Sequence, residues 1–275
     1  MHLDIASYSG IGKRIVNEDF ILTNENNKFF VVCDGVGGQE KGEIASKAAA
    51  EHLNSFFSTH NIEGKTIVNV TRELENKFSS FISENKFSKG MATTIAFLKL
   101  NSDKSASVGF CGDTRVYQFR NSKIIFKTKD HSYVQELVDS GYLTEDEARK
   151  HPKKNIVTRA LQGNDSPTSI EYHNNLTVLD NDVFLLCTDG VIEALSDDEL
   201  ISIMSDHNDM NCIGDNIISE CNEKSQDNNS FIILKCKIEN SVGSLDNQGT
   251  PNKYKSIILL ILIIISIILL LKFFL

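Results

Sequence analysis

Three short apolar segments of this sequence end in the same way, and this shared ending constrains the fold more than any other feature. The segments are FFVVC before Asp34-Gly35, VGFC before Gly112-Asp113, and FLLC before Thr188-Asp189-Gly190. Short apolar runs that are bounded by turn residues are typical of buried strands. The sequence therefore predicts a core built on sheets, with carboxylates placed where strands end.

A fourth carboxylate, Asp227, stands just before the apolar segment FIILKC, and Glu18 and Asp19 precede another apolar run. In an antiparallel sheet one strand ends where its neighbour begins, so we expect Asp227 beside Asp34 or Asp189 at one rim. A single Asp-Gly pair is most often only a turn. Carboxylates that gather at one rim repel one another unless a cation neutralises them. Oxygen ligands select hard cations such as Mg²⁺ or Mn²⁺, and the sequence has no His or Cys cluster with zinc spacing.

The periodicity of the chain predicts an α+β protein. Strands are expected at 28–33, 91–100, 105–111, 114–119, 123–127, 182–187 and 231–236, and the four between 91 and 127 are expected to form one antiparallel meander. Helices are expected over 40–60 and 66–82, and as pairs over 131–150, with Asp130 or Ser132 as the N-cap, and over 197–222. Strands in runs, with helices grouped between them, favour α+β layers over alternating βαβ units.

The net charge and the cysteines indicate which partners and which cellular compartment to expect. The chain has 28 Lys and Arg against 37 Asp and Glu, a net charge of −9, which argues against nucleic acid as a partner. The 6 cysteines form no C-x-x-C pair, so we expect reduced, buried thiols. The first residues, MHLDIASYSGIGKR, contain no apolar stretch of a secretory signal, and we expect the domain to be cytosolic.

Seven short blocks occur in a fixed order between residues 5 and 238. They are Arg14-x-x-Asn17-Glu18-Asp19, Asp34-Gly35-Val36-Gly37-Gly38, Gly90-Met91-Ala92-Thr93-Thr94, Gly112-Asp113-Thr114-Arg115, Asp130-His131-Ser132, Asp189-Gly190 and Asp227-Asn228. In this order and at this spacing the blocks resemble the PPM-type (type 2C) serine/threonine protein phosphatases, and more narrowly their bacterial branch.

This resemblance implies a four-layer α-β-β-α sandwich with two central antiparallel sheets over residues 1–239, and a dinuclear metal centre at one end. It also implies roles: Asp34 as the bridging carboxylate, Glu18 and the Gly35 carbonyl on one ion, Asp189 and Asp227 on the other, Asp19 ordering waters, Asp113 on a third and weaker ion, and Arg14 as the phosphate clamp. The implied cofactor is Mn²⁺ or Mg²⁺, with two ions per subunit and a third in many bacterial members.

The implied reaction is direct attack of a metal-bridging hydroxide on phosphoserine or phosphothreonine in proteins, which counteracts a serine/threonine kinase. The chain departs from some members of the family at Val36, where they have a histidine that protonates the leaving group. Val36 has no proton to give, and His131 belongs to a motif that is mostly structural in the family. Segment 131–168 resembles the variable flap region, which either contacts the substrate or only covers a sheet edge.

Other functional classes are weaker alternatives. Arg14 taken alone would be an ordinary solvated arginine, and only the order of the blocks favours the phosphate clamp. The sequence has no P-loop motif and no cysteine with an arginine six positions later, so it resembles neither a P-loop nucleotidase nor a cysteinyl phosphatase. An inactive phosphoprotein-binding module on the same fold is the remaining alternative. We expect such a module to lack one or more metal carboxylates, and this chain has them all.

The end of the chain differs from the rest. Residues 240–255 are polar and predict a linker, and residues 256–275 form an apolar run that is broken only by Ser266 and Lys272. At ~1.5 Å per residue, the run from Ile257 to Leu275 spans ~28 Å, close to the ~30 Å of a bilayer core, provided that Lys272 snorkels to the far headgroups.

A buried C-terminal helix is the alternative for this run. It fits less well, because the run is apolar on every face and follows a polar linker. Lys253 and Lys255 on the near side, against Lys272 on the far side, favour a near side in the cytosol. We therefore expect a single-pass membrane protein whose catalytic domain is cytoplasmic.

Overall fold

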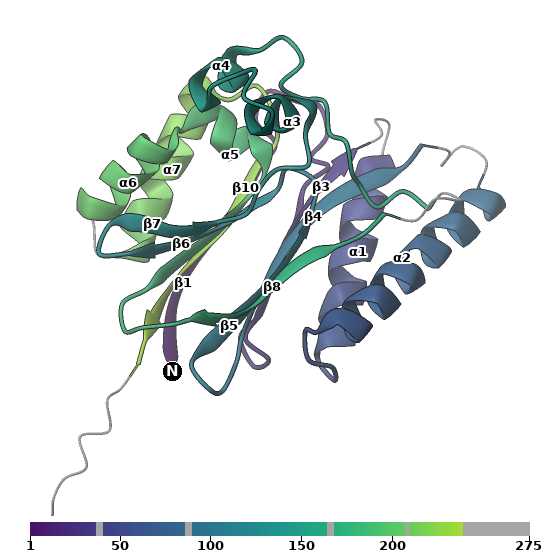
Figure 1. Cartoon of the computed structure of the whole chain (residues 1–275), viewed down its shortest axis with the longest axis horizontal. Helices are drawn as coiled ribbons and strands as arrows, with labels where there is room; N and C mark the ends of the chain where they lie inside the picture. Colours follow the sequence, from purple (N-terminus) through teal and green to yellow (C-terminus); the bar gives the residue numbers. More distant parts are fainter. Residues whose placement is uncertain (37–40, 86–89, 164–167, 207–208, 239–275) are drawn as a thin grey trace, which may run out of the picture. The chain divides into compact units, whose positions relative to one another are not determined.

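A computed structural model of the chain describes residues 1–36, 41–85, 90–163, 168–206 and 209–238. Residues 1–239 form one compact unit (Figure 1). The expected linker over 240–255 and the expected transmembrane helix over 256–275 lie outside the described residues. Within the described ranges, no helix has the length and apolarity needed to cross a membrane.

Two five-stranded antiparallel sheets form the centre of this unit. The first sheet has the order β1-β10-β9-β6-β7, with bounds His2–Gly10, Asn229–Lys237, Val183–Cys187, Arg115–Arg120 and Lys123–Lys127. The second has the order β2-β3-β4-β5-β8, with bounds Phe20–Asn24, Phe29–Val36, Ala92–Leu100, Ser105–Cys111 and Glu171–Thr177.

Helices cover the outer faces of both sheets, which gives the expected four-layer α-β-β-α sandwich (Figure 1). On the second sheet lie α1 (Lys41–Phe57) and α2 (Gly64–Glu84), and on the first lie α5 (Asp189–Ala194), α6 (Asp197–Asp206) and α7 (Met210–Lys224). Two short helices, α3 (Tyr133–Asp139) and α4 (Glu145–Lys150), belong to the connection between β7 and β8. Ser132 is the N-cap of α3, and its hydroxyl accepts a hydrogen bond from the Gln135 N–H.

The alternation of side chains along β3 explains why this strand is apolar on both faces. Phe29, Val31 and Cys33 pack into the core beneath α1 and α2, whereas Phe30 and Val32 pack into the core between the two sheets. Successive side chains of a strand point to opposite faces, so a central strand covered on both sides needs apolar residues at every position. The strand can therefore carry a carboxylate only near its end, where Asp34 stands.

The expected meander from 91 to 127 is wrong. Strands β4 and β5 pair in the second sheet, and β6 and β7 pair in the first, so the chain crosses between sheets after Cys111. Gly112 makes this crossing with a φ of +107°, a backbone conformation that residues with a Cβ rarely adopt. A Cβ at this position would also collide with Thr94. The crossing places Asp113 at the rim shared by the two sheets.

Three strands and one helix were not expected from the sequence. Strands β1, β2 and β8 lie at sheet edges; many side chains of β1 and β8 are polar and partly exposed, and β2 has only 5 residues. An edge strand pairs on one side only and needs few apolar residues, so its pattern is weak. Helix α5 is too short to show a helical period.

Candidate metal centre

The predicted carboxylates meet at one end of the sandwich, around a cavity of about 540 Å³. Strand β3 ends there, β9 passes into α5 there, and β10 begins there. The cavity is lined by all but one of the predicted residues: Arg14, Glu18, Asp34, Gly35, Asp113, Asp189 and Asp227. Because β10 pairs with β9, Asp227 lies at the same end as Asp189 in the first sheet, whereas Asp34 belongs to the facing sheet.

Two close approaches of the backbone fix Asp34 and Glu18. The Gly35 N–H donates to the Glu18 carbonyl at 3.1 Å, and the Thr93 hydroxyl donates to the Asp34 carbonyl at 2.8 Å. A Cβ on Gly35 would collide with the Gly42 backbone, so glycine is required at this position. The Gly42 N–H in turn donates to the Glu18 carboxylate at 3.2 Å. These contacts bring Glu18 to the cavity beside the end of β3.

Asp19 is the one predicted residue that does not line the cavity. Its side chain is buried, and one carboxylate oxygen accepts a hydrogen bond from the Thr188 hydroxyl at 3.0 Å. The other oxygen has no hydrogen-bond partner among the described residues. Burial, together with the nearby charge of Asp189, raises the pKa of Asp19 to about 8.

Burial and mutual repulsion together raise the pKa values of three carboxylates around the cavity. Burial raises the pKa of Asp34 well above its usual range, and the charges of Asp189 and Asp19 add to this effect. Burial and the charge of Asp227 raise the pKa of Asp189 to about 7. The pKa of Asp113 is also raised, by burial and then by Asp189. Carboxylates forced together in this way are stabilised in the ionised form by a bound cation.

Arg14 points into this acidic cluster rather than standing free. Its guanidinium donates a hydrogen bond to the Asp227 carboxylate at 2.5 Å, and this bond raises the pKa of Arg14. The side chain of Arg14 is 56% exposed, against 26% for Asp227. The arginine therefore reaches the cavity from its open side, where a substrate would enter.

The side chains around the cavity offer the type of ligand atom that hard divalent cations prefer. The side-chain donors are all oxygen atoms, and one buried oxygen of Asp113 has no hydrogen-bond partner among the described residues. In the described part of the chain, no three His, Cys, Asp or Glu side chains already form a group that could hold a metal ion. Asp227 is engaged by Arg14 and Glu18 by Gly42, so two expected ligands have other partners. The ligand roles therefore remain predictions.

Asn228 is a site residue that the sequence analysis quoted but did not interpret. Its side-chain oxygen accepts from the Glu18 N–H at 2.9 Å, and its amide donates to the carbonyls of Ile11 and Val16 at 2.8 and 2.9 Å. The side chain thus ties the loop that carries Arg14 and Glu18 to the start of β10. The adjacency to Asp227 was the only available signal, since the three contacts cross more than 200 positions of sequence.

His131 holds the Asp113 loop and does not line the cavity. Its ring Nδ1 accepts from the Gly112 N–H at 3.1 Å, and the backbone N–H of His131 donates to the Gly112 carbonyl at 2.9 Å. Its Nε2 lies 3.1 Å from the Glu171 carboxylate. Val36 does line the cavity and is 44% exposed, so no side-chain proton donor stands at that position.

A sandwich of two antiparallel sheets with an arginine and clustered carboxylates at one end fits the class of metal-dependent phosphohydrolases. The sequence model of the family described as Protein phosphatase 2C matches residues 8–224. The chain therefore belongs to the protein phosphatase 2C family and is a metal-dependent serine/threonine protein phosphatase, as the resemblance implied. Nothing in the site or the comparisons favours the inactive binding module.

Curated relatives and solved structures agree with this assignment. Protein phosphatase PhpP of Streptococcus pneumoniae is 29% identical over 215 residues, which cover 74% of this chain and 85% of that protein. The serine/threonine phosphatase stp of Listeria monocytogenes is 28% identical over 231 residues, which cover 79% and 89%. The structure of Stp1 from Staphylococcus aureus has a TM-score of 0.75 at 29% identity and covers 86% of this chain and 96% of that one.

The likeness extends to a structure that contains metal. The catalytic domain of the phosphatase PstP, solved in complex with two manganese ions, has a TM-score of 0.73 at 23% identity, with 86% of this chain and 99% of that chain covered. At this identity the comparison concerns the fold.

Proposed function

We propose that the cavity holds two divalent ions, Mn²⁺ or Mg²⁺, and that Asp34 bridges them. Glu18 and the Gly35 carbonyl would bind one ion, Asp189 and Asp227 would bind the other, Asp113 would bind a third and weaker ion, and Asp19 would order water. The observation that carries this proposal is the convergence of these residues on one cavity from both sheets. A metal-bound structure of the same fold supports the number of ions.

The ions would supply the positive charge that polarises the phosphoryl group and activates water. The chain itself supplies the clamp, because the planar guanidinium of Arg14 can exchange the Asp227 carboxylate for two phosphoryl oxygens. Among the described residues that line the cavity there is no His, Lys, Cys or Tyr. We expect the proton for the leaving serine or threonine oxygen to come from water.

The substrates are proteins that a serine/threonine kinase has phosphorylated. The test is phosphate release from a phosphothreonine peptide by the full-length protein with Mn²⁺, with Mg²⁺, and after exhaustive treatment with EDTA. We expect activity with either ion and none after chelation. Full activity after chelation would contradict the metal centre, and a failure with both ions in a folded protein would contradict the phosphatase reaction.

We further propose that residues 1–239 are the catalytic domain, that 240–255 are a linker, and that 256–275 anchor the protein in a membrane with the domain in the cytoplasm. The apolar run and its flanking lysines support this arrangement. Strand β10 has 9 residues and leads from beside Asp227 to Lys237, a path of about 30 Å at ~3.3 Å per residue. The end of β10 therefore lies far from the catalytic cavity.

A further inference from the structure

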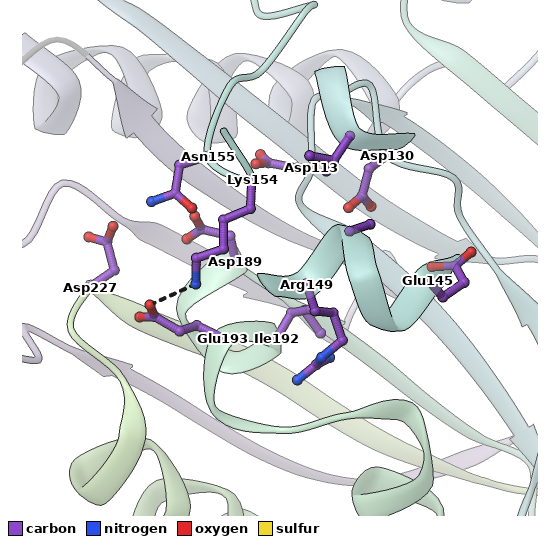
Figure 2. A pocket seen from close by; sticks show the side chains of 12 residues that line it. Asp113, Asp130, Glu145, Arg149, Lys154, Asn155, Asp189, Ile192, Glu193 and Asp227 are labelled. Carbon is purple, nitrogen blue, oxygen red and sulfur yellow. Dashed lines mark hydrogen bonds and ion pairs between the residues drawn. The ribbon is translucent and has the colours of Figure 1, made fainter. Parts of the chain in front are cut away.

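Asn155 lines two cavities at once. One is the catalytic cavity, and the other is a smaller space of about 110 Å³ beside it, between α3, α4 and α5. The two share four lining residues among those described, of which Asn155 is the only one that is not a carboxylate; the others are Asp113, Asp189 and Asp227. In Figure 2, which shows the lining of the smaller cavity, the Asn155 side chain points toward the side where Asp189 and Asp227 lie. Asn155 thus marks the passage between the two spaces.

The amide of Asn155 has no hydrogen-bond partner within the described part of the chain, and the residue is exposed. A side-chain amide presents a donor and an acceptor side by side. A peptide group offers the complementary acceptor and donor, whereas a phosphoryl group at neutral pH offers mainly acceptors. An uncharged amide beside carboxylates therefore suits the backbone of a bound peptide.

The smaller cavity has room for part of a peptide side chain. Val134 of α3, Ala148 of α4 and Ile192 of α5 form its apolar walls. A volume of about 110 Å³ exceeds several-fold the ~10–15 Å³ that a single water requires. A peptide whose phosphorylated residue occupies the catalytic cavity would pass Asn155 before its neighbouring side chain enters this space.

Anchors on both sides hold Asn155 in place. The Lys154 ammonium pairs with the Glu193 carboxylate of α5 at 3.1 Å (Figure 2), and Glu193 also accepts from the Gln226 N–H at 2.8 Å. On the other side, the Ile156 carbonyl accepts from the Tyr133 N–H at 2.9 Å. Because α5 begins at Asp189 and Gln226 precedes Asp227, the ion pair ties Asn155 to the segments that carry these carboxylates.

We propose that Asn155 hydrogen-bonds the backbone of the peptide next to the phosphorylated residue, and that the Lys154–Glu193 ion pair positions it. The role extends the phosphatase reaction: Asn155 selects phosphorylated peptides over small phosphate esters. It rests on the catalytic cavity described above and assigns substrate recognition to the connection between β7 and β8.

The test compares kcat/KM for a phosphothreonine peptide with kcat/KM for p-nitrophenyl phosphate, which has no peptide backbone. In Asn155→Ala the ratio of the two values should fall by up to about tenfold, the upper end of what one lost hydrogen bond removes. Lys154→Met should lower the same ratio by a smaller factor, and Lys154→Arg should restore it. Lys153→Met is the matched control, because this neighbouring lysine lies over the Tyr133 ring and lines neither cavity.

A second readout needs no turnover. With Mn²⁺ present, Asn155→Ala should weaken binding of a non-hydrolysable phosphonate analogue of the peptide by up to about tenfold in fluorescence anisotropy, with a smaller effect on competition by inorganic phosphate. Equal losses on peptide and ester, or unchanged peptide binding in folded protein, would overturn the proposal. A wild-type protein that cleaves neither substrate would instead contradict the phosphatase reaction, and the binding measurement would still decide the role of Asn155.

Discussion

The guanidinium of Arg14 lies 2.5 Å from the carboxylate of Asp227, although 213 positions separate them in the sequence. The residue proposed to clamp phosphate and a residue proposed to bind metal therefore hold each other in this structure. A bound cation would give Asp227 a new partner, and a phosphate group would give Arg14 one. The ion pair keeps the arginine over the cavity and limits the freedom that it loses when substrate binds.

Loss of Arg14 should impair substrate capture more than folding. We expect Arg14→Ala to lower kcat/KM for a phosphothreonine peptide by ~10–100-fold, because it removes charge-assisted hydrogen bonds worth ~1.5–3 kcal/mol. Inhibition by inorganic phosphate should weaken in parallel, and Arg14→Lys should recover only part of the loss, since an ammonium lacks the planar fork. Lys13→Met, a change at the exposed neighbouring cation, is the control. Phosphate inhibition that stays as strong in Arg14→Ala would exclude the clamp.

The carboxylates should differ in their importance for metal binding. Asp34→Asn removes the proposed bridge and should reduce activity far more than Asp113→Asn, which removes a ligand of the weaker ion. Titration calorimetry with Mn²⁺ should show the loss of high-affinity binding in the first variant and its retention in the second. Equal losses of affinity in both variants would contradict the assignment of the bridge to Asp34.

His131 should make stability depend on pH at mildly acidic values. Burial and then Arg159 lower the pKa of His131 below its ordinary 6.5, while Glu171 and Asp130 oppose this shift. The unfolded chain therefore binds more protons than the folded one as pH falls below 6.5, so the free energy of unfolding decreases on acidification. A protonated ring would also lose the Nδ1 acceptor that holds Gly112.

Urea unfolding of EDTA-treated protein at several pH values checks this prediction. At neutral pH, His131→Ala should have a free energy of unfolding that is lower by the ~1–3 kcal/mol of a lost buried hydrogen bond, and its urea midpoint should decline less toward acid. His2→Ala, at an exposed position near the N-terminus, should follow the wild type. A His131→Ala protein whose midpoint falls as steeply as that of the wild type would show that other groups cause the decline.

We expect Asp182, which lies far from the catalytic cavity, to contribute strongly to the stability of the fold. Its fully buried carboxylate accepts two hydrogen bonds from Arg120 at 2.7 and 2.8 Å, and one each from Gln118 and the Leu179 N–H. Removal of one member of such a pair leaves its partners unsatisfied, and we expect Asp182→Ala to cost ~3–5 kcal/mol. Thermal unfolding measures this loss, with the exposed Asp206→Ala as control. A loss below that of the control would refute it.

The proposed membrane anchor makes a prediction about location in the cell. Full-length protein should remain in the membrane fraction after carbonate extraction, whereas a chain that ends at Asn252 should be soluble. Protease added outside intact cells should leave the domain uncut, and protease added to opened cells should digest it. Soluble full-length protein, or digestion from outside, would rule out this topology.

The parts of this protein that depend on local chemistry can be predicted from the order of its residues alone. Short apolar runs identified the central strands, and the carboxylates at their ends, such as Asp34 and Asp189, identified the catalytic rim. The order of the motifs identified the family, and helical periods identified α1 and α2. These features follow from side-chain alternation, amphipathic spacing and turn residues, all of which lie within a few positions of one another.

The three-dimensional structure was needed to show which distant segments meet. It placed β5 and β6 in different sheets, set Asp227 beside Asp189, paired Arg14 with Asp227, and brought Asn155 to the passage between two cavities. Strand pairing and side-chain contacts across hundreds of positions depend on how all layers pack at once. A local sequence pattern does not encode that packing. Edge strands such as β8 form only when a neighbouring strand pairs with them, so their own sequence does not predict them.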